Sequence, residues 1–345
     1  MKVLMLGNYN INNYSRGRII YEGLKENHIP TKIYLPNKKR YFKLAKKILR
    51  KDFGILIVTG KFVLMLSWLL KPIHRKKIIF DVFISDYENL VIDRKIVNPR
   101  SVKAKILYLG DKIACKLADH NILDTKEHIE YFHKKFNLKK SKFSPIYVGS
   151  DSKVFKPQNK TSKNFTVEFH GTFIPLQGIE YIIKTAKILE KEDIQFRIIG
   201  TGQEYNKIIK LKENLNLKNV YFSNKNISLK ELSEEINSGD ICLGIFGKSI
   251  KTQNVIPNKA FEIIACKKPL ITSKTPAIEE LFKDQENCIL CEATNEKDLA
   301  EKILLLKNNP KLLKNISENG YKLFINKLNK DKIVIPLIKI LTSNR

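Results

Sequence analysis

Short runs of hydrophobic residues alternate with longer stretches of helical periodicity along the whole chain. The short runs are rich in Val, Ile, Leu and Phe, which favours buried strands, whereas the longer stretches repeat apolar positions at helical spacing. Strands separated by helices are typical of parallel sheets with crossover connections. The pattern therefore predicts an α/β protein. Its strands are expected at residues 2–6, 32–34, 55–58, 77–83, 120–123 and 143–148, and again at 165–170, 195–199, 220–222, 241–245, 269–273 and 288–290.

The alternation is interrupted near the middle of the chain. Residues 149–164 are mostly polar or turn-forming and include a proline. The 345 residues also exceed the ~100 to 150 residues of a common single domain. We therefore expect two Rossmann-like domains, 1–150 and 158–328, and a C-terminal helix at 329–345 that crosses back to the first. Ligands of open parallel sheets bind beyond the carboxyl ends of the strands, so two such domains face each other across a ligand-binding cleft.

The composition is that of a globular protein, with 43% hydrophobic and 28% charged residues. The longest apolar stretch, residues 62–70, is far shorter than the ~20 residues that span a bilayer, and the apolar start of the chain is too short for a secretory signal. We expect a cytoplasmic protein without a transmembrane helix. Cys288 and Cys291 lack a second pair of ligands nearby, so the sequence predicts no metal site and favours buried, reduced thiols.

The net charge of +28 is unevenly distributed: residues 1–150 hold 31 Lys and Arg against 12 Asp and Glu. This asymmetry indicates that the first half meets a polyanion or an anionic membrane surface, although AT-rich coding also increases the lysine and asparagine content. The segment from Lys38 to Lys51 carries eight cations around an apolar stripe of helical spacing. We expect it to pack on its own sheet and also to meet anionic lipid headgroups.

Two further inferences concern partners of this basic half. Residues 62–70 are a second candidate for a membrane-facing element, although burial within the domain is their expected role. Nucleic-acid binding is not predicted, because the chain has no zinc-finger spacing, no RNA-recognition aromatic motif and no clustered recognition helix.

Candidate ligand-binding residues follow the expected strands. Gly7 leads from the first strand toward a helix that begins near Arg16, where an anion pocket or a polar surface turn are equally consistent with the sequence. Glycines also follow the strands of the second half, where they allow a ligand to approach the backbone. These glycines are Gly171, Gly178, Gly200 and Gly202. Each alone is compatible with an ordinary tight turn.

A further helix start lies at Pro257, a residue suited to the first turn of a helix. The free amides at such an N-terminus suit a diphosphate. Glu262 lies one turn further along, among apolar residues. Its carboxylate either holds a pair of sugar hydroxyls or faces solvent, and the sequence by itself slightly favours the solvated interpretation.

In their joint order and spacing these motifs resemble the family 4 retaining glycosyltransferases of GT-B fold. The resemblance rests on residues 169–179, 200–202 and 257–269, and in the first half on 80–81, 93–95 and 124–128. It implies a metal-independent glycosyltransferase at the inner membrane face. Such an enzyme moves a sugar from a nucleotide-sugar donor, which is a substrate and not a cofactor, to a glycan or lipid-linked acceptor of the cell surface.

The resemblance also implies roles for individual residues. Glu262 matches the glutamate that holds the donor ribose, while Asn254 replaces the first glutamate of the family motif. Thr172 and Gln177 replace two cations that grip the diphosphate in relatives, and Lys259 is expected to supply that charge instead. The other residues expected near the donor are Gly7, Arg16, His170, Gly171, Gly178, Gly200, Gly202, Val255 and Ile256.

Asp81 occupies the place where several relatives have a histidine near the reacting sugar, and Asp86 follows it. Both are catalytic candidates, but neither is assigned as a nucleophile, because the family's chemistry is pictured as attack on the face that the diphosphate leaves. The protein then positions the acceptor and stabilises charge. Two alternatives remain: an epimerase of the same fold, and a non-catalytic sugar-nucleotide binder, which the changes at Asn254, Thr172 and Gln177 favour.

Overall fold

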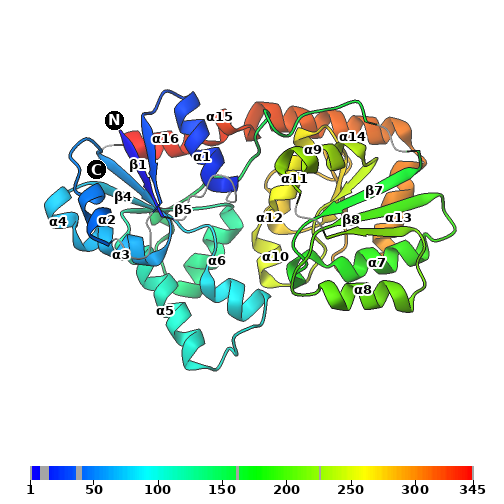
Figure 1. Ribbon diagram of the computed structural model, residues 1–345, viewed down its shortest axis with the longest axis horizontal. Helices are drawn as coiled ribbons and strands as arrows, with labels where there is room; N and C mark the ends of the chain where they lie inside the picture. Colours follow the sequence, from blue (N-terminus) through cyan, green and yellow to red (C-terminus); the bar gives the residue numbers. More distant parts are fainter. Residues whose placement is uncertain (1, 8–14, 36–40, 161–162, 225–226, 344–345) are drawn as a thin grey trace. The chain divides into compact units, whose positions relative to one another are not determined.

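The computed structural model describes residues 2–7, 15–35, 41–160, 163–224 and 227–343. The chain divides into two compact units: Met1–Gly149 with Lys330–Arg345 form unit 1, and Ser150–Asn329 form unit 2 (Figure 1). The division falls in the turn-rich stretch where the sequence pattern is interrupted. The segment after Asn329 belongs to unit 1. Among the described residues, no helix combines the length and apolar character needed to cross a membrane.

Unit 1 contains a parallel sheet whose described strands have the order β2-β1-β3-β4-β5-β6. The strands are β1 (Val3–Leu6), β2 (Thr31–Tyr34), β3 (Ile55–Val58), β4 (Lys77–Asp81), β5 (His120–Leu123) and β6 (Phe143–Pro145). The helices are α1 (Ser15–Glu26), α2 (Tyr41–Ile48), α3 (Lys61–Leu69), α4 (Lys71–His74), η1 (Glu88–Asp93), α5 (Val102–Leu117), α6 (Lys126–Phe136), η2 (Lys140–Lys142), α15 (Lys330–Ile333) and α16 (Ile335–Thr342). Every residue of β1 and β3 is buried, as expected for strands covered on both faces by helices.

The C-terminal helices α15 and α16 pack on unit 1 through contacts with α1 and β4. Lys330 of α15 donates hydrogen bonds to Glu22 at 2.7 Å and forms an ion pair with Glu26 at 3.3 Å. A Cβ on Gly23 would lie 2.3 Å from the Lys330 carbonyl oxygen, so only glycine fits where α1 meets α15. Lys77 of β4 donates to the Ile340 carbonyl at 2.6 Å. Two helices from the C-terminal part of the sequence thus belong to the first unit.

Unit 2 contains a second parallel sheet, whose described strands have the order β12-β11-β10-β7-β8-β9. The strands are β7 (Phe165–His170), β8 (Ile194–Ile199), β9 (Val220–Ser223), β10 (Ile241–Leu243), β11 (Leu270–Ser273) and β12 (Ile289–Cys291). The helices are η3 (Pro175–Gln177), α7 (Ile179–Ile188), α8 (Tyr205–Asn214), α9 (Leu229–Ser238), α10 (Ile250–Asn254), α11 (Asn258–Ala265), α12 (Pro276–Glu279), α13 (Glu296–Lys307), α14 (Pro310–Leu323) and η4 (Phe324–Leu328). Chain order runs outward in both directions from β7, which is the Rossmann arrangement.

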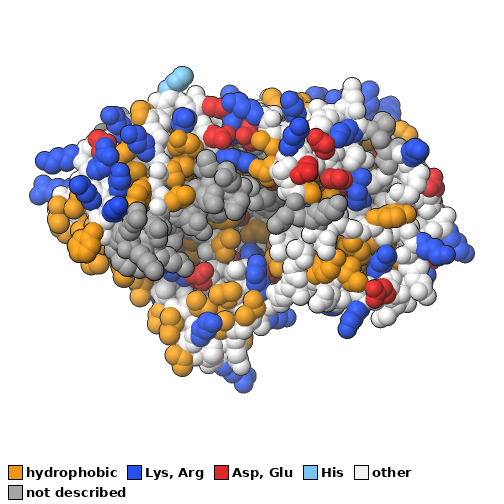
Figure 2. Space-filling model, in the orientation of Figure 1, with side chains coloured by type: hydrophobic (Ala, Val, Ile, Leu, Met, Phe, Trp, Pro, Cys, Tyr) orange, Lys and Arg blue, Asp and Glu red, His pale blue; other side chains and the backbone are white. Residues whose placement is uncertain are grey.

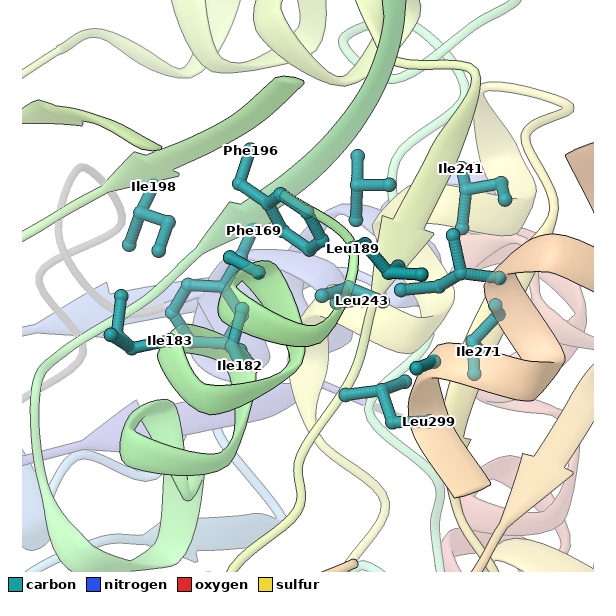
Figure 3. Packing of buried hydrophobic residues seen from close by; sticks show 14 of the residues in the cluster. Phe169, Ile182, Ile183, Leu189, Phe196, Ile198, Ile241, Leu243, Ile271 and Leu299 are labelled. Carbon is teal, nitrogen blue, oxygen red and sulfur yellow. The ribbon is translucent and has the colours of Figure 1, made fainter. Parts of the chain in front are cut away.

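The core of unit 2 lies between its sheet and the helices α7 and α13. Figure 3 shows Phe169 and Phe196 from neighbouring strands packed with Ile182 and Ile183 of α7. Leu243 and Ile271 extend the same cluster toward Leu299 of α13. Because these residues occur at strand and helix spacing in the sequence, their burial follows from the hydrophobic pattern.

The structure confirms the twelve strands expected from the sequence, with small shifts at their ends. The largest shift is at β6, which ends at Pro145 instead of residue 148. The expected burial of residues 62–70 is wrong in part: Val63 and Leu64 are buried, but Phe62 and Trp68 are 48% and 42% exposed. This stretch forms α3, and a helix on the outside of a sheet buries only one of its faces.

Candidate functional site

The order of the strands in unit 2 reverses between β7 and β10, and ligands of such sheets bind beyond the strand ends at this reversal. The loops that begin here depend on glycine. Gly200 has φ +137°, and a Cβ on it would lie 2.0 Å from the Gly171 carbonyl oxygen. The backbones of the loops after β7 and β8 therefore touch with no side chain between them at this point.

A histidine held between two carboxylates lies at the end of β7. His170 Nδ1 lies 3.0 Å from Glu168 Oε1, and His170 Nε2 lies 3.3 Å from Glu262 Oε2 of α11. All three side chains are buried. Burial alone would lower the pKa of His170, but the charges and hydrogen bonds of Glu168 and Glu262 outweigh it and raise the pKa to about 9. The histidine is thus an imidazolium at neutral pH that orients Glu262.

Glu262 is therefore not solvated. It is 8% exposed, and its neighbours in α11 are buried as well. The sequence slightly favoured a carboxylate in water, and this expectation is wrong because α11 is buried from Lys259 to Ala265, where it packs against α14, η4 and β11. A buried carboxylate needs a charged or hydrogen-bonding partner, and His170 provides it.

Lys259 of α11 is buried beside this cluster. Its Nζ donates to Gln177 Oε1 at 2.7 Å and to the Gly244 carbonyl at 3.3 Å, and it lies 3.5 Å from the centre of the Phe169 ring. A Cβ on Gly171 would come within 2.9 Å of the same nitrogen. Burial lowers the pKa of Lys259 well below its ordinary value, while the charges of nearby carboxylates oppose the shift. An anion bound at Gly171 would stabilise the protonated form.

The other candidate residues of unit 2 differ in their exposure to solvent. Asn254, the last residue of α10, is buried, as are Val255 and Ile256. Gly178 has φ +65°, and a Cβ there would meet the backbone of Phe246 at 2.5 Å, so it is a glycine for reasons of packing. Thr172 and Gly202 are exposed, so both are accessible from solvent.

The candidates from unit 1 contact one another. Arg16 Nε donates to Asp81 Oδ1 at 2.8 Å, Arg16 Nη1 donates to the Ile146 carbonyl at 2.6 Å, and both side chains are buried. Gly7 packs with its Cα against Thr59, whose carbonyl oxygen would lie 2.1 Å from an added Cβ. Residues 8–14 of the same loop lie outside the described residues. The roles of Arg16 and Asp81 in donor binding and catalysis stay predictions.

Asp86 is an exposed residue at the start of the helical turn that leads into η1, and it pairs with Lys61. Lys61 Nζ lies 2.7 Å from Asp86 Oδ2 and 2.7 Å from Asp111 Oδ1. Asp111 also accepts from Ser85 Oγ at 2.8 Å. The turn that carries Asp86 is therefore tied to α3 and α5, and the catalytic assignment of Asp86 stays a prediction.

The contacts of two buried histidines with carboxylates were not predicted from the sequence. Glu168, which holds His170, lies two residues before it on β7, and strand alternation places both on one face, so this signal was available. In unit 1, His128 Nδ1 lies 2.6 Å from Asp124 Oδ1 and His128 Nε2 lies 3.0 Å from Glu88 Oε2. No local pattern connects Glu88 with a residue forty positions away.

The basic segment from Lys38 to Lys51 lies only partly within the described residues, because residues 38–40 are outside them. In α2, Leu44 and Ile48 are 1% and 0% exposed and pack in the core of unit 1. Lys43 and Lys46 face solvent. The apolar stripe of this helix is thus buried in the core of unit 1, and its exposed lysines are the side chains that can contact another surface.

Comparison with known proteins identifies the family. Residues 150–323, half of the chain, match the model of "Glycosyl transferases group 1". The chain belongs to this family. It is 31% identical over 202 residues to an uncharacterized glycosyltransferase of Methanocaldococcus jannaschii, a match covering 56% of this chain and 52% of that protein. It is 22% identical to the chitobiosyldiphosphodolichol beta-mannosyltransferase of Debaryomyces hansenii, over 63% of this chain and 52% of that one.

A solved structure agrees with this assignment at the level of the fold. The Anabaena protein HepE, solved in complex with UDP, superposes with a TM-score of 0.76 at 14% identity and covers all of both chains. The expected GT-B fold is therefore confirmed. The match spans about half the length of the two curated relatives above.

Proposed function

We propose that this group 1 protein is a retaining glycosyltransferase that takes a sugar from a nucleotide-sugar donor bound by unit 2. The observation that carries the proposal is the buried cluster at the reversal of the sheet. Two residues of the first turns of α11 take part in it. Glu262 is oriented by His170, and Lys259 lies next to Gly171. A carboxylate beside a lysine amine that an anion would protonate suits a ligand that carries both a diol and a diphosphate.

Each part of the donor has a counterpart in this cluster. Glu262 is held through Oε2, so Oε1 is oriented to accept hydrogen bonds from the two ribose hydroxyls. The diphosphate lies against the backbone of Gly171, within reach of Lys259. A uridine nucleotide is the first donor class to test, since HepE, of the same fold, was solved with UDP.

The chemistry proposed is substitution with retention. The bond from the anomeric carbon to the diphosphate breaks and its electrons stay on the phosphate oxygen. The acceptor hydroxyl forms its bond on the same face and gives its proton to that oxygen. The task of the protein is then to hold both reactants in place and to stabilise the charge on the departing diphosphate, without a metal.

The acceptor is proposed to be a glycan or a lipid-linked sugar used for surface glycans. The D. hansenii relative is named for a diphosphodolichol-linked sugar, which is a lipid-linked substrate. The cations between Lys38 and Lys51 support a peripheral position at an anionic membrane face, because exposed lysines are attracted to acidic headgroups. Asp81 and Asp86 are retained as candidates for positioning the acceptor.

A second candidate function is binding of a nucleotide sugar without transfer, or its epimerisation. It is favoured by Asn254, which is uncharged where the family has a glutamate, and by the uncharged Thr172 and Gln177. Incubation with a bound donor and candidate acceptors separates the possibilities. A transferase yields a longer glycan, an epimerase yields a free altered sugar, and a binder yields neither.

Donor binding gives the first testable prediction. A nucleotide that binds only the folded chain raises its unfolding temperature, so a thermal-shift screen with UDP-, GDP-, ADP- and CMP-sugars identifies the donor class. For the donor found, Glu262→Ala is expected to weaken binding about 10- to 100-fold in calorimetry, because hydrogen bonds to a charged group are lost. Glu213→Ala, an exposed change on α8, is the control and should leave affinity unchanged. Equal affinity for the wild type and the Glu262 variant would contradict the assigned ribose contact.

A further inference from the structure

Exposed hydrophobic side chains gather on two neighbouring helices of unit 1, α3 with its continuation α4, and α5. They are between 42% and 72% exposed. We call them the apolar ridge: Phe62, Met65, Trp68, Leu69 and Ile73 of α3 and α4, and Val102, Ile106, Leu109 and Ile113 of α5. The two helices pack against each other. Figure 2 shows hydrophobic side chains along the lower left edge of the molecule, over the region that holds α3 and α5 in Figure 1.

The ridge is a regular feature of the helices. On α5 the exposed residues recur at intervals of four, three and four, which places them on one face of the helix. The opposite face, with Ala104, Ala114 and Cys115, is buried against the domain. Apolar residues scattered singly over a surface are ordinary, whereas a continuous apolar face marks a surface that meets something else.

Positive charge predominates around the ridge, where the exposed Asp86 and the half-buried Asp119 pair with Lys61 and Lys71. Residues 61–75 contain no Asp or Glu, and the one acidic residue of α5, Asp111, is buried and paired with Lys61. The exposed cations here are Lys103, Lys105 and Lys116 of α5 and Arg75, which follows α4. The surface therefore combines apolar side chains with positive charge, a combination suited to the interface of an anionic bilayer. A second copy of this chain would instead oppose cation to cation.

We infer that unit 1 docks on anionic membranes through the apolar ridge, with its apolar side chains at the acyl boundary and its lysines at the lipid phosphates. The inference adds a specific surface to the peripheral membrane association proposed above. The apolar contact with the membrane is assigned to α3 and α5, because the apolar stripe of α2 is buried. Docking itself does not depend on sugar transfer.

A groove of about 300 Å³ adjoins the ridge, and it connects the proposed docking surface with the region of the catalytic candidate Asp86. Leu109 and Lys105 line it together with Tyr87, which follows Asp86 in the chain. If the acceptor is lipid-linked, its anionic headgroup reaches unit 1 beside Asp86 when the ridge lies on the bilayer. This placement, unlike docking itself, rests on the proposed function.

Trp68 provides a direct test because it is the only tryptophan of the chain and belongs to the ridge. Adding vesicles of phosphatidylcholine with phosphatidylglycerol to the full chain should shift its emission to the blue, and brominated acyl chains should quench it. Vesicles of phosphatidylcholine alone, or high salt, should give a much smaller change. Co-sedimentation with anionic vesicles without any change in Trp68 emission would overturn the inference in favour of the α2 cations alone.

Substitution supplies an independent test by vesicle co-sedimentation. The double change Ile106→Gln and Leu109→Gln is expected to lower partitioning onto anionic vesicles about tenfold. The matched control, Ile188→Gln with Leu305→Gln, removes two exposed apolar residues of unit 2 and should bind as the wild type does. Equal loss in both double variants, or no loss in either, contradicts docking through the ridge.

Two further measurements separate this inference from its alternatives. Donor binding measured by calorimetry should be the same in the ridge variant and the wild type, so failure of docking and failure of the donor site are seen independently. Light scattering of the free protein reports self-association. A dimer that Ile106→Gln with Leu109→Gln dissociates would show that a second copy, and no membrane, covers the ridge.

Discussion

Replacing Lys259 by alanine is expected to lower kcat/KM for sugar transfer by ~10²-fold or more, the effect of losing one preorganised donor that stabilises charge. A diphosphate gains negative charge as the glycosidic bond breaks, and the amides at the start of a helix such as α11 offer only about half an elementary charge. Thr172 and Gln177 are uncharged. The buried amine of Lys259 lies beside the Gly171 backbone, where an added Cβ would be 2.9 Å from its Nζ, and it can carry the missing charge once an anion is bound.

The effect should depend on pH in a defined direction. Burial lowers the pKa of Lys259 well below its ordinary value, so the free protein loses this proton at lower pH than an exposed lysine does. A bound diphosphate favours the charged form and restores the proton. Donor binding is therefore expected to take up a proton and to weaken as the pH rises, which calorimetry in buffers of different ionisation enthalpy measures. The Lys259→Ala variant should show no such uptake.

The contact between Lys259 and Gln177 allows a rescue experiment. Lys259 Nζ lies 2.7 Å from Gln177 Oε1, so a lysine at position 177 would place its charge near the same point. The variant Lys259→Ala with Gln177→Lys should recover most of the lost activity. Lys267→Ala, an exposed change just after α11, is the matched control. Near-wild-type turnover by Lys259→Ala under saturating donor would refute the assignment. The search for the missing cation would then turn to Arg16 and Arg18 of α1 and to Lys251 of α10.

The second large effect is expected on stability. Replacing His128 by leucine should lower the free energy of unfolding by about 3 to 5 kcal/mol, because Glu88 and Asp124 would remain buried without their shared cation. Trp68 lies in the same unit and reports its unfolding by fluorescence during urea denaturation. The triple variant Glu88→Gln, Asp124→Asn and His128→Leu should recover most of the loss, since no uncompensated charge is left.

The same cluster sets a pH dependence. Burial would lower the pKa of His128, but the charges of Glu88 and Asp124 raise it from 6.5 to about 10 in the folded chain. A raised histidine pKa means that its contribution to stability is complete below pH 6.5 and is lost as the pH rises through about 10. Denaturation curves over this range should show the loss in the wild type and not in the triple variant. A flat profile in the wild type would contradict a charged His128.

The order of strands and helices, the two-part organisation and the resemblance to a family were all available from the sequence. Hydrophobic periodicity is a local property, so each of the twelve strands can be recognised from a short stretch of sequence. The glycines after β7 and β8 were also visible, because glycine is favoured where a tight turn after a strand needs a positive φ. Candidate loops could thus be named without knowledge of the packing.

Which side chains meet was decided only by the tertiary structure. Arg16 pairs with Asp81 across 65 residues, and Glu262 meets His170 across 92. These contacts depend on how strands align in the sheets and how helices rotate on them. A hydrophobic pattern shows that a helix has a buried face, but whether that face is covered by its own domain, as on α2, or left open, as on α3, depends on elements distant in the chain. For the same reason a carboxylate that looked solvated in the sequence is buried and bound to a histidine in the fold.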